Sequence, residues 1–223
     1  MSVNLIPMLT WNDVTVEDAF EVFENSKNAP AKHWGFKKDG IKPEDATILV
    51  KRMKSAGKEV FFEALVEEEH ECVDAAKFAL EHDFDYLMGV EYFESVVEVL
   101  KGSSVELIPS CGRKEGMPRK LYGTIEEIVT AGVNLQDKGV YGIILSPYRY
   151  QDGDPAELTD TFVNAVKLPI FIAGSVNSNE RLDVMKRINP WGFTIGSAFF
   201  ENNFGEGLTF GEQISKVVDY LNN

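Results

Sequence analysis

The sequence predicts an α/β protein, a single (β/α)8 barrel that spans residues 1–223. Eight short apolar runs alternate along the chain with segments whose apolar residues recur at helical spacing. No linker rich in proline, glycine or serine divides them, and no block of like charge does. The 223 residues allow about 28 per strand–helix unit, near the lower limit for this fold. An open doubly wound sheet is the alternative, but eight consecutive units favour closure.

The expected strands are apolar at consecutive positions, which is typical of parallel strands buried on both faces. They are residues 3–8, 34–36, 60–66, 86–90, 105–108, 140–145, 169–173 and 192–195. The helices between them are indicated by apolar stripes, for example at Val16, Ala19, Phe20 and Phe23. Two helix starts have capping-box spacing, Thr124 with Glu127 and Thr209 with Glu212.

The composition narrows the choice of partners. With 36 acidic and 22 basic residues the formal net charge is −14, which disfavours binding to nucleic acid or to an anionic membrane. Cys72 and Cys111 form no disulfide framework. No signal peptide or membrane span is recognisable, so we expect a cytoplasmic protein. The oligomeric state stays open between a monomer and a homodimer.

Two loops rich in small residues follow the last two predicted strands. They read Ala173-Gly174-Ser175 and Gly196-Ser197-Ala198. Active sites of these barrels lie at the carboxyl ends of the strands. Small residues there allow backbone N–H groups to approach an anion, and a short helix from Ser197 would add to the attraction. We therefore expect a phosphate site at Gly174, Ser175, Gly196 and Ser197. The alternative is that the glycines only pack helix against strand.

This pair of motifs resembles that of the ribulose-phosphate-binding barrels, which include tryptophan- and histidine-biosynthesis barrels and several sugar-phosphate epimerases and decarboxylases. The resemblance covers the whole chain as a strand–helix pattern but is motif-specific only in the last quarter. It implies a phosphorylated small-molecule ligand.

The patterns of particular reactions in this superfamily do not match. The three histidines, His33, His70 and His82, are not placed at strand ends as metal ligands would be, so we expect no metal. The sixth strand has no lysine that could form a Schiff base, and no cofactor motif is present.

Charged residues that interrupt apolar runs are the catalytic candidates. Glu63 lies within an apolar strand, where a carboxylate facing the helices would be costly, so it should point into the barrel. Lys37 ends the neighbouring strand and can meet it. The pair is either an acid and base beside a sugar carbonyl or a structural ion pair.

Two weaker candidates for proton transfer follow other strands. Cys111 follows the fifth strand and needs nearby cations to lower its pKa; otherwise it is a small core residue. Asp13 follows the first strand and is alternatively a helix-entry residue.

Basic residues are concentrated in the loops after the second, fifth and sixth strands. Arg113 or Arg149 can bind a second acidic group of the ligand, or these loops form a solubilising surface. The leading hypothesis is a metal-independent isomerase or epimerase that acts on a small phosphorylated sugar or sugar acid by proton transfer next to a carbonyl. The alternatives are a phosphosugar lyase (an aldolase or decarboxylase) and a regulatory barrel that binds a phosphometabolite without catalysis.

Overall fold

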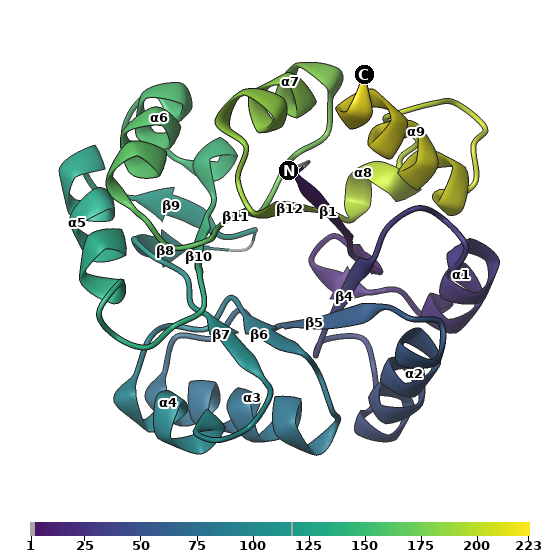
Figure 1. Ribbon diagram of the computed structural model, residues 1–223, viewed down its shortest axis with the longest axis horizontal. Coiled ribbons are helices and arrows are strands. Elements are labelled where there is room, and N and C mark those ends of the chain that lie inside the picture. The colour runs from purple at the N-terminus through teal and green to yellow at the C-terminus, as the bar shows by residue number, and fades with distance from the viewer. Residues whose placement is uncertain (1–2, 117) are drawn as a thin grey trace.

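The computed structural model describes residues 3–116 and 118–223, whose backbone forms a ring of parallel strands surrounded by helices (Figure 1). The ring strands are β1 (Asn4–Pro7), β4 (His33–Lys37), β5 (Glu59–Glu63), β6 (Tyr86–Met88), β7 (Glu106–Ile108), β10 (Ile143–Leu145), β11 (Ile170–Ile172) and β12 (Gly192–Ile195). Each overlaps one of the eight predicted strands. Most are shorter than predicted.

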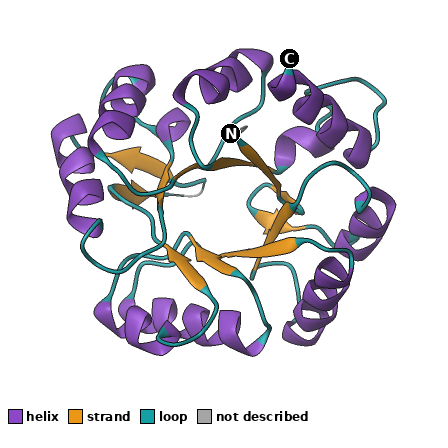
Figure 2. Cartoon of the chain, viewed as in Figure 1, coloured by secondary structure: helices purple, strands orange, loops and turns teal. Residues whose placement is uncertain are grey.

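The ring is closed. Its strands form two parallel sheets, ordered β1–β12–β11–β10 and β4–β5–β6–β7. Bridges join the sheets at both seams, where Met8 pairs with Gly35 and Ser110 pairs with Ile144. At the second seam the Ile144 N–H donates to the Pro109 carbonyl at 2.9 Å. The predicted (β/α)8 barrel is therefore confirmed, and the helices lie outside the strands (Figure 2).

The helices are α1 (Ala19–Ser26), α2 (Pro43–Ser55), α3 (Glu69–Glu81), α4 (Glu94–Leu100), α5 (Ile125–Leu135), α6 (Pro155–Ala165), α7 (Asn179–Ile188), α8 (Ser197–Phe200), α9 (Phe210–Asn222) and the 3-10 turn η1 (Pro147–Arg149). Both predicted capping boxes are present, at the starts of α5 and α9. Within the described ranges, no helix is both long enough and apolar enough to cross a membrane.

Successive side chains of a strand point alternately into the barrel and toward the helices, so the buried apolar residues form two clusters. One fills the barrel interior and includes Ile6, Phe61, Ile144 and Phe171. The larger one packs strands against helices and includes Trp34. The buried residues of the interior cluster are at most 5% exposed, so they fill the barrel interior.

Two antiparallel hairpins at the mouth were not predicted. The first pairs β2 (Thr10–Trp11) with β3 (Val14–Thr15), and the second pairs β8 (Arg113–Glu115) with β9 (Lys120–Tyr122). Asn12 and Asp13 form the two-residue turn of the first, with φ of 49° and 64°, as type I′ turns require. The expectation of Asp13 at a helix entry is wrong, because α1 begins only at Ala19.

Candidate functional site

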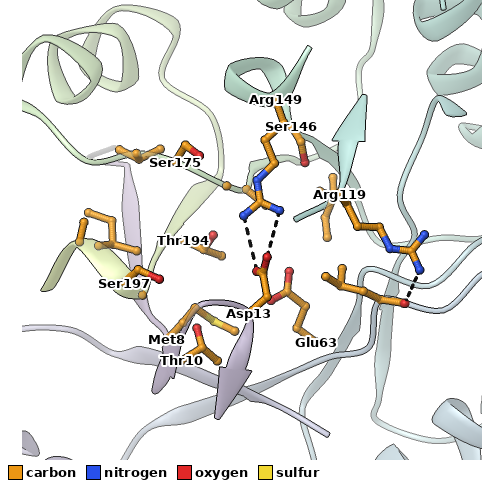
Figure 3. Close-up of a pocket in the computed structure, with 18 of the residues that line it drawn as sticks. Met8, Thr10, Asp13, Glu63, Arg119, Ser146, Arg149, Ser175, Thr194 and Ser197 are labelled. Atoms are coloured by element: carbon orange, nitrogen blue, oxygen red, sulfur yellow. Dashed lines mark hydrogen bonds and ion pairs between the residues drawn. The ribbon is translucent and has the colours of Figure 1, made fainter. Parts of the chain in front are cut away.

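A pocket of about 260 Å³ opens at the mouth of the barrel (Figure 3). The polar side chains that line it are Thr10, Asp13, Glu63, Ser110, Lys114, Arg119, Ser146, Arg149, Ser175, Asn177, Thr194, Ser197 and Glu201. Since active sites of this fold lie at this end, the pocket is the candidate site. Among residues 3–116 and 118–223, no three His, Cys, Asp or Glu side chains come together as metal ligands would.

The loop after β11 forms one wall of the pocket. Gly174 and Ser175 have φ of 83° and 63°, and the left-handed conformation of Ser175 is unusual for a residue other than glycine. Arg181 holds this loop through a hydrogen bond to the Ser175 carbonyl. Within the described chain, the N–H groups of Gly174 and Ser175 donate to no protein acceptor. Both residues line the pocket.

The loop after β12 forms the adjoining wall, and its backbone N–H groups at Gly196 and Ser197 are likewise without an acceptor among the described residues. A Cβ atom on Gly196 would lie 2.5 Å from Thr10 Oγ1 and 2.7 Å from the Thr10 carbonyl oxygen. Gly196 therefore allows its loop to pack closely against the first hairpin. The same residue lines the pocket, so a packing role does not exclude a place in the site. The Ser197 hydroxyl accepts the Asn12 N–H at 3.0 Å. The helix that follows has only four residues, so its backbone N–H groups matter more than its dipole.

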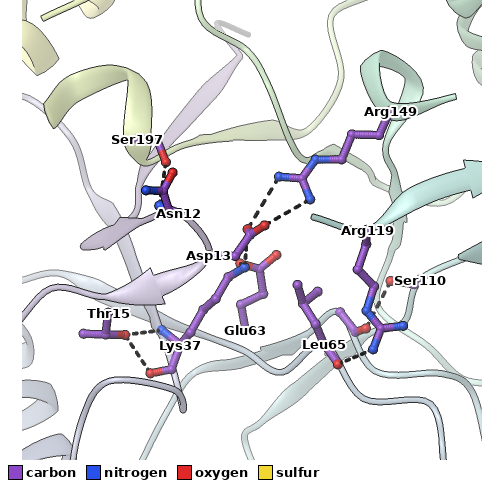
Figure 4. A network of polar contacts seen from close by, with 11 residues as sticks. Asn12, Asp13, Thr15, Lys37, Glu63, Leu65, Ser110, Arg119, Arg149 and Ser197 are labelled. Carbon is purple, nitrogen blue, oxygen red and sulfur yellow. Dashed lines mark hydrogen bonds and ion pairs between the residues drawn. The ribbon is translucent and has the colours of Figure 1, made fainter. Parts of the chain in front are cut away.

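A buried ion-pair network crosses the floor of the pocket (Figure 4). Lys37 and Glu63 are partners in the β4–β5 register, and Lys37 Nζ lies 3.2 Å from Glu63 Oε2. The same Nζ lies 2.7 Å from Asp13 Oδ1. Lys37 is only 3% exposed, and its backbone N–H and carbonyl both bond to the Thr15 hydroxyl. The structure thus brings together three residues that the sequence singled out.

Arg149 extends this network toward the small-residue loop. Its guanidinium lies 3.4 Å from Asp13 Oδ2, and a Cβ atom on Gly174 would lie 2.6 Å from its Nε. Burial by itself would raise the pKa of Asp13, but the charges and hydrogen bonds of Lys37 and then of Arg149 outweigh burial and lower that pKa. Asp13 is therefore a carboxylate at neutral pH.

Glu63 differs from Asp13 in having an unused oxygen. Its Oε2 faces Lys37, whereas its Oε1 has no hydrogen-bond or ion-pair partner in the described part of the chain. Both carboxylates line the pocket.

Two predicted site residues do not reach the pocket. Cys111 is 3% exposed, its Sγ faces the Ile144 carbonyl, and burial raises its pKa to about 12. It is a core residue, and the expectation of a reactive thiol is wrong. Arg113 lies over the Tyr122 ring, 5.1 Å from its centre, and pairs with Glu115 outside the pocket.

The second hairpin supplies two other cations instead. Lys114 and Arg119 line the pocket, and neither was singled out as a site residue. The signal available in the sequence was the density of basic residues in this loop. The hydroxyls of Thr194 and Ser146 were also missed, because single hydroxyl residues at strand ends carry no distinctive pattern.

Comparison with solved structures shows the same fold throughout the chain. Orotidine 5'-phosphate decarboxylase from Pyrococcus horikoshii OT3 superposes with a TM-score of 0.72 at 14% identity, covering 98% of this chain and 99% of that one. N-(5'-phosphoribosyl)anthranilate isomerase from Pyrococcus furiosus gives 0.66 at 15% identity, covering 99% of both chains. The tryptophan synthase alpha chain from Legionella pneumophila gives 0.65 at 14% identity, with 100% and 92% covered.

This chain has the fold of those barrels. The barrel fold that the sequence predicted is therefore confirmed, and at 14–15% identity the likeness is one of fold. No protein-family model and no curated protein sequence matches the chain. Its chemistry must therefore be argued from its own pocket.

Proposed function

We propose that this protein is an enzyme that moves a proton next to the carbonyl group of a small phosphorylated sugar or sugar acid. The phosphate of this ligand lies against the loops after β11 and β12. It accepts hydrogen bonds from the backbone N–H groups of Gly174, Ser175, Gly196 and Ser197. What supports this position is that these donors have no acceptor within the described chain and belong to residues that line one pocket. The Arg149 side chain packs against Gly174 and adds a positive charge beside the phosphate.

The single observation that carries the reaction is the free oxygen of Glu63 beside the buried Lys37. In the proposed step, Glu63 Oε1 takes a proton from the carbon next to the carbonyl, and the electron pair moves onto the carbonyl oxygen. Arg149 stabilises the resulting negative charge. The hydroxyl on the deprotonated carbon then passes its proton to this oxygen. As the new carbonyl forms there, Glu63 returns the proton it took to the former carbonyl carbon, which completes an isomerisation.

Epimerisation needs a second proton donor on the opposite face of the reacting carbon. Asp13 is the second carboxyl that contacts Lys37, but its lowered pKa leaves it ionised at neutral pH, without a proton to donate. Isomerisation is therefore favoured over epimerisation. Lys37 acts as a positioning residue, because it contacts both carboxylates.

Proton exchange with solvent tests the reaction. The protein is incubated in D2O with a panel of aldose and ketose phosphates, and deuterium incorporation next to the carbonyl is followed by NMR. Wild-type protein should exchange at least one of them, and Glu63→Gln should lower that rate about a hundredfold while leaving affinity unchanged. Binding without exchange or turnover would instead support the regulatory barrel, and carbon–carbon cleavage would support a lyase.

Calorimetry with inorganic phosphate tests the binding site separately. Ser175→Asp puts a carboxylate among the proposed phosphate donors and should weaken phosphate binding at least tenfold by like-charge repulsion. Ser178→Asp is the matched control, because Ser178 does not line the pocket and begins α7 as its N-cap. Equal effects of the two substitutions would contradict the proposed site.

A further inference from the structure

Beyond the phosphate site, the second hairpin brings two cations into the same pocket. Lys114 on β8 and Arg119 before β9 both line the pocket, and their side chains are 8% and 19% exposed. In Figure 3, Arg119 lies across the pocket from Ser175 and Ser197, with Asp13 and Glu63 between them.

Both cations have hydrogen-bond donors to spare. Lys114 Nζ uses two of its three, toward Glu91 Oε1 at 3.3 Å and the Gly112 carbonyl at 3.1 Å. The guanidinium of Arg119 bonds to the Leu65 carbonyl at 2.7 Å and to a Glu67 oxygen, but its Nε is buried without a partner among the described residues.

The carboxylates that pair with these cations face away from the pocket. Glu67 and Glu91 line a separate surface hollow, which Lys114 also borders, and neither lines the pocket at the barrel mouth. Lys114 therefore stands between the two hollows.

The charge inside the pocket also favours an anion at this wall. Lys37 is engaged by Asp13 and Glu63, and Arg149 pairs with Asp13 and lies against Gly174, at the proposed phosphate end of the pocket. Glu201 is the remaining carboxylate among the lining residues and hydrogen-bonds with Trp11, which belongs to the first hairpin. The cations of the second hairpin are thus not neutralised from the pocket side, in a chain whose net charge is −14.

We propose that Lys114 and Arg119 form a second anion subsite, which binds a carboxylate at the far end of the substrate. A guanidinium and an ammonium on one wall match the two oxygens of a carboxylate. This inference rests on the proposed function and narrows its substrate class from phosphorylated sugars in general to phosphorylated sugar acids. The carbon chain then passes over Glu63 and Asp13, where the proposed proton transfer takes place.

A pair of ligands that differ only at one end tests the subsite. Ribonate 5-phosphate carries a carboxylate where ribitol 5-phosphate carries an alcohol, so the two ligands share the phosphate and differ only at the second subsite. Wild-type protein should bind the ribonate at least tenfold more tightly, since one charge-assisted hydrogen bond contributes about that factor. Lys114→Gln and Arg119→Gln should each reduce the preference, and ribitol 5-phosphate should bind all variants equally.

Arg113→Gln and Lys120→Gln are the matched controls, because both side chains belong to the same hairpin but neither lines the pocket. They should keep the preference. If phosphate binds but wild type shows no preference for the ribonate, or if the preference survives both substitutions, the subsite is refuted while the proposed function stands. If no phosphate compound binds, both proposals fail.

Discussion

Replacing Lys37 by methionine tests the buried network most directly. Lys37 is 3% exposed and contacts Asp13 and Glu63, whose side chains are 16% and 10% exposed. Methionine keeps most of the volume and removes the charge. Two neighbouring carboxylates are then left in a nearly dry site, and Asp13 alone retains a second cation, Arg149.

Removing one partner of a buried ion pair costs about 3–5 kcal/mol. Asp13 keeps Arg149 as a partner and both carboxylates retain some exposure, so the cost of Lys37→Met should lie at the lower end of this range. We therefore expect the free energy of unfolding at neutral pH to fall by about 3 kcal/mol. For a chain of this length that corresponds to a fall in Tm of about 6–12 °C.

The loss should shrink in acid. The folded-state pKa of Asp13 is lowered, so its carboxylate stabilises the wild-type fold above the unfolded pKa, and this stabilisation disappears as pH falls through the folded pKa. The variant lacks Lys37, so its Asp13 carboxylate stabilises the fold less and acid removes less stability from it. The free energies of unfolding of wild type and variant should therefore converge as pH falls.

Urea unfolding followed by circular dichroism, at neutral pH and at about pH 2.5, which is below the ordinary aspartate pKa of 3.8, measures both effects. Lys38→Met is the matched control, because the adjacent Lys38 is exposed; it should change stability by less than about 0.5 kcal/mol. If Lys37→Met costs no more than Lys38→Met at neutral pH, or if its cost does not fall with pH, the network does not hold the pocket as described.

Three further outcomes can be measured. The Cys111 thiol, with its pKa raised to about 12, should react with a disulfide reagent at mildly alkaline pH far more slowly than a free thiol and should become reactive on unfolding; rapid reaction of the folded protein would contradict its burial. Thr209→Ala removes a capping box and should cost about 1 kcal/mol of unfolding free energy in urea, whereas Ser215→Ala within the same helix should cost less; equal costs would argue against the cap. Gly196→Ala should lower that free energy by about 1–3 kcal/mol, because its Cβ would crowd Thr10, and an unchanged value would show that the backbone adjusts freely.

The sequence was sufficient for the fold because every level of its pattern agreed. Apolar runs and helical stripes predicted the same strand–helix alternation, and two capping boxes marked helix starts within it. The structure confirms the eight ring strands and both boxes. The meeting of Glu63 with Lys37 was also accessible, because a charge within an apolar strand must face inward and neighbouring parallel strands bring their ends together. Neighbouring parallel strands also bring together the small-residue loops that follow the last two strands, and both loops line the pocket.

Only the tertiary structure decided which cations belong to the site and that Cys111 does not. Successive residues of a strand point to opposite faces, so a shift of one residue in the β8–β9 hairpin exchanges Arg113 with Lys114. Nothing in the local sequence sets that register, and Arg113 faces outward while Lys114 and Arg119 face the pocket. Cys111 follows a strand, as a catalytic residue would, but its role depends on contacts with residues distant in the chain, and those contacts bury it. Local pattern determines strands and helices, whereas the membership of a site depends on long-range packing, which local pattern does not encode.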